Sequence, residues 1–440
     1  MVAGLDNDYQ VVSLSWNSNG SSLAVAYGKT NHTTWCEHHS AVSIWSVFRR
    51  DFDPKKATTN IEVSNCLTQV AFHPTDPLIL AGGTMNGEIY LWNIGADEPQ
   101  LCVSDIDEYY HREAITKLIW VRQESLTSLE VKTTLMSTST DGKILVWRLK
   151  DKLRYPIKGH LLARKKGADT QVIGGTSLDK VSLMEDNTYL VGTEGGSIFK
   201  CSIAQPSDND ISHFFEENTG LRWKHEAIAL LSNLPSKVVM EVKRRVERYV
   251  KDKGEKDVWA PTVYHAKPDI KLLFPIPFNA NYEKHLGPVL GVSCSPFVKR
   301  MFLTCSSDGA VRLYDVLNHR PVAVYEPGYQ EYLTAVCWSP FRPTVFVTVS
   351  NAGTVYIYDM ILSRQAPSYM LEYSSSAGSK QFSKHKTAYS INFNPRQRDF
   401  LAIGYHDGCT KIFQLNYSLS NQKKDELKIL KSFLDEKGSE

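Results

Sequence analysis

A short motif with a glycine at its centre recurs along the 440-residue chain. In the stretch SSDGAVRLYDV (306–316), a turn containing Asp-Gly leads into a strand of alternating apolar residues. Such dipeptides supply the positive φ of a tight hairpin turn, and apolar residues at period 2 favour a β-strand. Six copies keep the glycine and a seventh has Ser40 in its place; the glycines are Gly87, Gly142, Gly196, Gly309, Gly353 and Gly408. The motif therefore predicts seven β-hairpins of one kind.

Further strand signals surround these hairpins. Upstream of the glycine in several copies, one apolar strand ends at a Ser-Pro or His-Pro turn and a second strand runs to the glycine. An outer strand follows the motif, for example in RPVAVYEP (320–327). Four short antiparallel strands repeated seven times predict an all-β fold, a seven-bladed β-propeller. One blade cannot bury both faces of its sheet, so the stacking of blades around an axis supplies the core.

The spacing of the glycines predicts one insertion. Successive glycines are 44 to 55 residues apart, except that 113 residues separate Gly196 from Gly309. We therefore expect blades one to four over 1–203, an insertion between blades four and five with an extended return over 204–284, blades five to seven over 285–415, and a tail over 416–440. The outer strand that closes the ring is expected either at 427–434 or from the N-terminal segment.

The insertion has a helical pattern over 221–254. Pro235 ends or kinks a first helix, and Val239, Val242 and Val246 form an apolar stripe on a second. Its basic residues lie largely off that stripe and include Arg244, Arg245 and Arg248. Two interpretations remain open: a helical hairpin packed on the propeller rim with a solvated basic face, or a docking element for an acidic protein partner.

Composition excludes several classes of function. The formal net charge of +2 does not favour nucleic acid as a partner. The N-terminal residues lack the pattern of a secretory signal, and no apolar run reaches the roughly 18 residues of a membrane span. The eight cysteines contain no C-x-x-C pair, so we expect a reducing compartment and neither a disulfide framework nor a zinc site. Cys36, His38 and His39 crowd together, but further metal ligands are not evident, and we expect no metal and no cofactor.

The polar residues of the repeat resemble those of the WD-repeat family, in which a hydrogen-bonded tetrad joins a His before the first strand, a Ser or Thr before the turn, the turn Asp and a Trp on the third strand. This resemblance implies one tetrad in blade three and one in blade five: His111, Ser139, Asp141 and Trp147, and His285, Ser306 and Asp308 with Tyr314 in the Trp position. The set recurs in several blades, whereas a catalytic site is built once, so we interpret it as structural. We expect no catalytic residue, and a seven-bladed WD-repeat β-propeller with a helical insertion between blades four and five.

The amino-acid sequence of the blades resembles that of the dynein intermediate chains, and among them those of the dynein-2 motor of intraflagellar transport. The stretches that carry the resemblance are YLVGTEGGSIFKCS (189–202), MFLTCSSDGAVRLYDV (301–316) and AVCWSPFRPTVFVTVSNAGTVYIYD (335–359). It implies a non-catalytic subunit of the cytoplasm, cytoskeleton and cilium, whose propeller binds the heavy-chain tail beside a second intermediate chain. Family members bind light chains through an N-terminal segment; only about seven residues precede blade one here, so light-chain binding is not expected of this chain.

Other assignments remain open at this point. The chain could be an intermediate chain of dynein-1 or of an axonemal dynein, or a WD-repeat scaffold of another class such as a ubiquitin-ligase substrate receptor, because a propeller fold does not specify its partner. A propeller hydrolase is disfavoured, since no blade carries an acid/base pair of its own. The loops before the first strands gather on one face, and their aromatic and arginine residues are the expected partner contacts: Tyr109, Tyr110, Arg112, Tyr329 and Tyr332.

Overall fold

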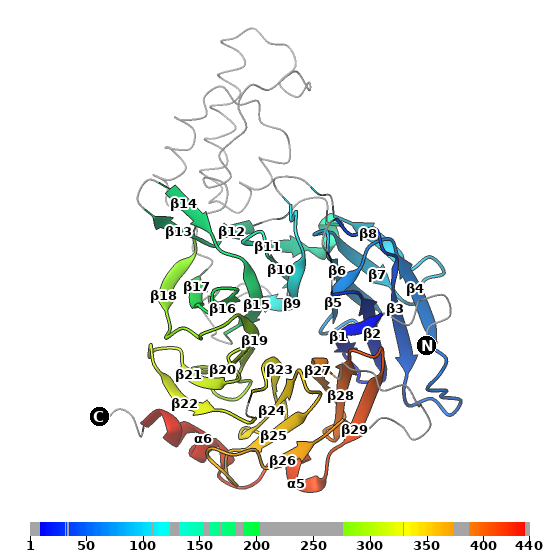
Figure 1. Cartoon of the computed structure of the whole chain (residues 1–440). Helices are drawn as coiled ribbons and strands as arrows, with labels where there is room; N and C mark the ends of the chain where they lie inside the picture. The colour runs from blue at the N-terminus through cyan, green and yellow to red at the C-terminus, as the bar shows by residue number, and fades with distance from the viewer. Residues whose placement is uncertain are drawn as a thin grey trace.

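Seven antiparallel sheets form a ring in the computed structural model (Figure 1). The described residues are 9–202 and 276–435, apart from short gaps at 31, 33–34, 105, 107–109, 124–131, 154–155, 157, 167–168, 182–187, 329 and 374–386. The predicted seven-bladed propeller is therefore confirmed for this part of the chain.

Each blade is a sheet of consecutive strands. Blades one to three consist of β1 (Gln10–Trp16), β2 (Ser22–Gly28), β3 (Ser40–Ser46) and β4 (Thr59–Val63); β5 (Leu67–Phe72), β6 (Ile79–Thr84), β7 (Ile89–Asn93) and β8 (Gln100–Val103); and β9 (Ile115–Gln123), β10 (Lys132–Ser139), β11 (Lys143–Arg148) and β12 (Lys158–Leu161). Blades four and five consist of β15 (Gly175–Lys180), β16 (Thr188–Thr193), β17 (Ile198–Ser202) and β18 (Phe278–Asn281); and β19 (Val289–Cys294), β20 (Met301–Ser306), β21 (Val311–Asp315) and β22 (Pro321–Tyr325). Blades six and seven consist of β23 (Leu333–Trp338), β24 (Val345–Ser350), β25 (Val355–Asp359) and β26 (Tyr369–Leu371); and β27 (Ala388–Phe393), β28 (Phe400–Tyr405) and β29 (Thr410–Gln414).

The core lies between neighbouring blades. The first strand of each blade packs against the first strand of the next, from β1 and β5 around to β27 and β1. Between blades one and two, for example, Ala26 and Val42 share an apolar cluster with Leu67, Val70 and Trp92. A blade therefore buries its two faces only through its neighbours, as the repeat predicts.

The predicted turn glycines adopt the expected backbone conformation. All six have positive φ, between 75° and 94°. At Gly309 a Cβ atom would also lie 2.7 Å from the carbonyl oxygen of Glu331. The backbone therefore requires glycine here, both for its φ and for the close approach of the next loop.

The long insertion lies inside blade four. Strand β18 pairs with β17, with Phe199 opposite Asn281, so it is the fourth strand of that blade. The sequence placed the extra residues between blades four and five, because spacing between glycine turns does not show on which side of an outer strand they fall. The helical pattern over 221–254 lies outside the described residues. A hairpin of β13 (Ala163–Lys166) and β14 (Asp169–Val172) precedes blade four and was not predicted.

Blades one and seven close the ring side by side, without exchanging a strand in the described residues. The backbone N–H of Leu14 donates to Ser390 Oγ at 3.0 Å, and the Trp16 indole N–H donates to the carbonyl of Asn392 at 3.2 Å. The Asn394 side chain donates to the carbonyl of Gly20 at 2.8 Å. These bonds join the two ends of the chain through blade packing.

The segment predicted as a closing strand is a helix. After β29 the chain forms α5 (Tyr417–Ser420) and α6 (Glu426–Asp435). Leu427, Leu430 and Phe433 recur every three residues, a helical period that a strand interpretation overlooks. Leu430 and Phe433 are buried in the apolar cluster between blades five and six, so the tail is part of the folded unit.

A buried arginine holds this tail in place. Arg342 is fully buried; its guanidinium donates to Asp359 at 2.9 Å, to Glu426 at the start of α6, and to the carbonyl of Ser418. Thr344 donates to Glu426 at 3.1 Å. The two carboxylates and the carbonyl thus satisfy a charge that would be costly to bury alone.

Candidate functional site

Blade three contains a chain of hydrogen bonds from an indole to a carboxylate. The Trp147 indole N–H donates to Ser137 Oγ at 2.9 Å, and the same hydroxyl lies 2.8 Å from His111 Nε2. His111 Nδ1 lies 3.3 Å from Asp141. With the ring proton on Nδ1, each donor in this series has one acceptor. His111, Ser137 and Trp147 are fully buried.

Blade five repeats three of these four members. His285 Nδ1 lies 2.9 Å from Asp308, and its Nε2 lies 2.8 Å from Thr304 Oγ1. Tyr314 occupies the aromatic position, where it stacks on Phe302 with ring centroids 5.0 Å apart. Its hydroxyl donates to a loop carbonyl at Glu283, so it does not join the histidine series as the tryptophan does.

The hydroxyl partners of the histidines are Ser137 and Thr304, where the sequence placed them at Ser139 and Ser306. Each predicted serine lies two residues later on the same strand and binds the turn. Ser139 donates to the carbonyl of Glu113 at 3.0 Å and accepts the backbone N–H of Asp141 at 3.2 Å. Residues two apart share a face of a strand, which is why spacing alone did not separate the two hydroxyls.

The electrostatics of these sets fit a structural role. Burial raises the pKa of Asp141, but the attraction and hydrogen bond of His111, with Lys143 nearby, outweigh it and hold the pKa at about 2. For Asp308, the hydrogen bond and attraction of His285 outweigh burial in the same way, and the pKa is again about 2. Each carboxylate stays ionised against a histidine whose two ring nitrogens are both engaged, so neither pair is available as a general acid and base.

One face of the ring is built from the glycine turns and from the loops that lead into the first strands; we name it the glycine-turn face. Each turn touches the loop of its own blade. The backbone N–H of Thr140 donates to Ala114, that of Ser307 to Pro288, and that of Asn351 to Tyr332. The face is therefore a set of short, hydrogen-bonded loops.

The polar turn residues also hold the backbone of exposed residues on this face. Asp141 accepts the backbone N–H of Arg112 at 3.0 Å, and Asp308 accepts that of Leu286 at 3.1 Å. In blade six, the side chain of Asn351 accepts the backbone N–H of Tyr332 at 3.0 Å. A backbone fixed in this way loses less conformational freedom when a partner binds.

The predicted partner contacts separate into three groups. Arg112 and Tyr332 are exposed, as a contact residue must be, whereas Tyr110 is 6% exposed and packs on Trp147. Tyr110 is therefore a core residue, because its ring covers the buried indole. The other predicted contacts lie outside the described residues: Tyr109, Tyr329, Arg244, Arg245 and Arg248.

Sequence reasoning missed two apolar residues of the glycine-turn face. Leu286 is 91% exposed and Trp35, in the β2–β3 loop, is 57% exposed. Leu286 follows His285 directly, so its place beside a tetrad histidine was the available signal. On the β2–β3 loop that carries Trp35 lie His32, Cys36 and His38, which together with Cys66 are described residues that could hold a metal ion.

The opposite face exposes aliphatic and tyrosine side chains and receives the C-terminal segment. Leu317, Leu362 and Tyr417 are 68%, 57% and 81% exposed.

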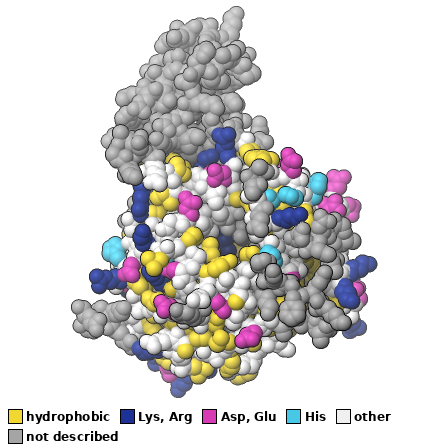
Figure 2. All heavy atoms as spheres, in the orientation of Figure 1, with side chains coloured by type: hydrophobic (Ala, Val, Ile, Leu, Met, Phe, Trp, Pro, Cys, Tyr) yellow, Lys and Arg dark blue, Asp and Glu magenta, His cyan; other side chains and the backbone are white. Residues whose placement is uncertain are grey.

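Figure 2 draws one face of the molecule in the orientation of Figure 1, and on its described part hydrophobic side chains are intermixed with charged side chains of both signs. A mixed surface of this kind favours a protein partner over a polyanion. Among the described helices, none is long and apolar enough to cross a membrane.

Comparison with known proteins finds similarity to the WD repeat and to dynein intermediate chains. The model of the WD domain, G-beta repeat, matches residues 57–93 and 278–315. The chain is 28% identical over 423 residues to the human protein "Cytoplasmic dynein 2 intermediate chain 2", and 28% identical over 433 residues to the mouse protein of that name. It is 23% identical over 416 residues to "Dynein intermediate chain 3, ciliary" of Heliocidaris crassispina.

These matches cover most of this chain and less of the relatives. They span 94%, 96% and 94% of this chain, but 66%, 68% and 54% of the respective relative. The chain therefore spans about two thirds of the length of the human and mouse proteins. The two WD matches each begin at an outer strand, β4 or β18, and end on the third strand of the next blade.

Proposed function

Since the chain is a WD-repeat propeller related to the dynein intermediate chains, we propose that it is a non-catalytic intermediate chain of the dynein-2 motor, acting in retrograde intraflagellar transport in cilia. The observation that carries this proposal is similarity to dynein-2 intermediate chains along 94% or more of the chain. In this role the chain binds a dynein heavy-chain tail beside a second intermediate chain, and ATP hydrolysis belongs to the heavy chain.

We assign heavy-chain binding to the glycine-turn face. Arg112, Leu286 and Tyr332 are exposed there, and each is held through its backbone by a polar turn residue. Arginine and aromatic side chains are enriched among residues that dominate interface energy. The opposite face, in contrast, already receives the C-terminal segment through Arg342.

The test is co-expression of the tagged full chain with heavy-chain tails of dynein-2 and of dynein-1, followed by affinity purification. We expect a stable complex with the dynein-2 tail and none with the dynein-1 tail. Selective recovery of the dynein-1 tail would show instead that the chain is an intermediate chain of dynein-1. Recovery of cullin adaptors from ciliated cells without any heavy chain would instead support the alternative of a ubiquitin-ligase substrate receptor.

A matched pair of variants tests the face. The triple variant Arg112→Glu, Leu286→Ser and Tyr332→Ala is expected to weaken tail binding at least about tenfold, since loss of anchor residues commonly costs more than 1 kcal/mol each. The control changes the exposed opposite-face residues: Leu317→Ser, Leu362→Ser and Tyr417→Ala. Loss of binding by the control variant alone would move the site to the opposite face.

The insertion is a second candidate contact. Reversing Arg244, Arg245 and Arg248 to Glu should leave the thermal unfolding curve of the propeller unchanged and reduce recovery of an acidic partner. Unchanged recovery would contradict the docking hypothesis and favour a helical hairpin that packs on the propeller rim with a solvated basic face.

A further inference from the structure

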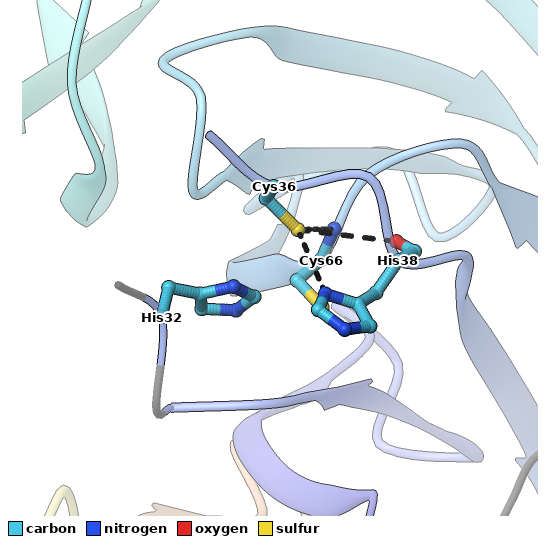
Figure 3. A group of neighbouring side chains, drawn as sticks. All are labelled: His32, Cys36, His38 and Cys66. Atoms are coloured by element: carbon cyan, nitrogen blue, oxygen red, sulfur yellow. Dashed lines mark hydrogen bonds between the residues drawn. The ribbon is translucent and has the colours of Figure 1, made fainter. Parts of the chain in front are cut away.

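Four side chains with metal-binding atoms meet where blade one joins blade two. His32, Cys36 and His38 come from the loop between β2 and β3, and Cys66 immediately precedes β5 (Figure 3). Their ligand atoms all lie within 4.8 Å of one another. A tetrahedral zinc site with bonds of about 2.0–2.3 Å has ligand atoms about 3.3–3.8 Å apart. The group is thus close to the arrangement of a Cys2His2 site, and small side-chain movements would complete it.

The surroundings of the histidine fit a metal ligand. His32 Nε2 lies 2.8 Å from the carbonyl oxygen of Lys29. Donation of the Nε2 proton to that carbonyl leaves the Nδ1 lone pair to bind a metal. A ligating histidine commonly donates its other ring N–H to a carbonyl or carboxylate in this way, which fixes its tautomer and orientation. The rings of His32 and His38 meet edge to face with centroids 5.2 Å apart.

The two sulfur atoms are also held in place. The backbone N–H of Cys66 donates to Cys36 Sγ at 3.3 Å, and that of Lys29 donates to Cys66 Sγ at 3.5 Å. The Asn86 side chain accepts from the backbone N–H of Cys36 at 3.0 Å and donates to its carbonyl at 2.9 Å. Zinc binds cysteine as the thiolate, so each thiol would release its proton to solvent as the ion binds. Both cysteines are buried, whereas His38 is exposed, so an ion could enter from the His38 side.

We propose that His32, Cys36, His38 and Cys66 bind one zinc ion that fastens the β2–β3 loop of blade one to the start of blade two. Two thiolates balance the charge of the ion, and four protein ligands leave no open position for catalysis. The role is therefore structural. It also explains why the sequence stretch with Cys36 and His38 lacked further ligands: His32 is separated from it along the loop and Cys66 belongs to the next blade. The site does not depend on the function proposed above.

The test uses the full chain, expressed without a histidine tag, purified without chelators under reducing conditions and analysed for metal by mass spectrometry. We expect about one zinc ion per chain, and loss of most of it in Cys66→Ser and in His38→Ala. His38 is exposed, so its variant should fold even if the buried Cys66→Ser variant does not. The matched controls are His39→Ala, one residue away on the same loop, and Cys409→Ser in blade seven, and both should keep the zinc.

A second readout identifies the ligands. Replacing zinc with Co²⁺ should produce absorption from thiolate-to-cobalt charge transfer, which Cys36→Ser and Cys66→Ser should weaken. A chelator should lower the melting temperature of the wild-type chain and not that of His38→Ala. The proposal is overturned if the folded, reduced wild-type chain holds no zinc and gives no such band with Co²⁺, or if thiol counting under non-reducing purification shows a stable Cys36–Cys66 disulfide that excludes metal.

Discussion

The buried histidines of blades three and five link the core of a blade to its surface. His285 connects Thr304, inside the sheet, to Asp308 at the turn, and Asp308 in turn accepts the backbone N–H of exposed Leu286. One carboxylate thus serves both the stability of the blade and the position of a surface residue. The sequence predicted the histidine and the aspartate of this set, whereas the choice of hydroxyl depends on how deeply the imidazole reaches along the strand.

Asp308→Asn should destabilise the chain by about 1–3 kcal/mol at pH 6, because it removes a charge-assisted hydrogen bond to His285. The folded-state pKa of Asp308 is about 2, below the unfolded value of about 3.9. Its contribution is therefore complete above about pH 4 and is lost as the pH falls toward 2. Urea unfolding between pH 6 and 3 should show that the difference in the free energy of unfolding between the wild-type and variant chains becomes smaller below pH 4. A difference that stays constant over this range would contradict the assignment.

Trp147→Ala should cost about 3–5 kcal/mol, since the indole is fully buried and its loss leaves a cavity. Trp147→Phe retains most of the ring but not the N–H that donates to Ser137, and we expect a loss of about 1 kcal/mol from that bond. Chemical denaturation of both variants separates the packing contribution from the hydrogen bond. Equal losses would mean that the hydrogen bond, rather than burial of the ring, dominates.

At the scale of elements, the apolar periodicity of the sequence predicts that α6 is a helix but does not predict where the helix packs. The apolar spacing of Leu427, Leu430 and Phe433 would have identified the helix, but the expectation of a closing strand in blade seven outweighed it. Its docking was beyond sequence reasoning, because Arg342 and Glu426 are 84 residues apart and no local pattern links them. The position of the insertion within blade four could not be predicted either, since only strand pairing reveals that β18 belongs to that blade.

Arg342→Ala should destabilise the chain by about 3–5 kcal/mol, because it leaves Glu426 buried without its cation and leaves Asp359 with only the partly exposed Lys423. The control is Arg49→Ala, which removes an exposed arginine paired with the exposed Asp51, and should cost no more than about 1 kcal/mol. Thermal and urea unfolding measure both. Limited proteolysis should also release the α6 segment of the Arg342 variant first. An effect equal to that of the control would show that apolar packing alone anchors the helix.

At the scale of the whole molecule, the repeat is the reason that so much of the architecture was predictable. Seven turns with alternating strands specify a propeller, and the φ of residues such as Gly309 follows from the turn chemistry. The functional surface was less predictable. Tyr110 and Arg112 are two residues apart in one loop, yet the first is in the core and the second is exposed. Only the packing of the ring against Trp147 distinguishes them.

The most direct test of the account is a cryo-electron microscopy structure of the full chain bound to the dynein-2 heavy-chain tail. We predict that the tail lies across the glycine-turn face and contacts Arg112, Leu286 and Tyr332, with the histidine sets of blades three and five unchanged beneath it. A tail bound only across Leu317, Leu362 and Tyr417 on the opposite face would contradict the assignment of the face. Failure of the two proteins to form a complex at all would contradict the proposed function itself.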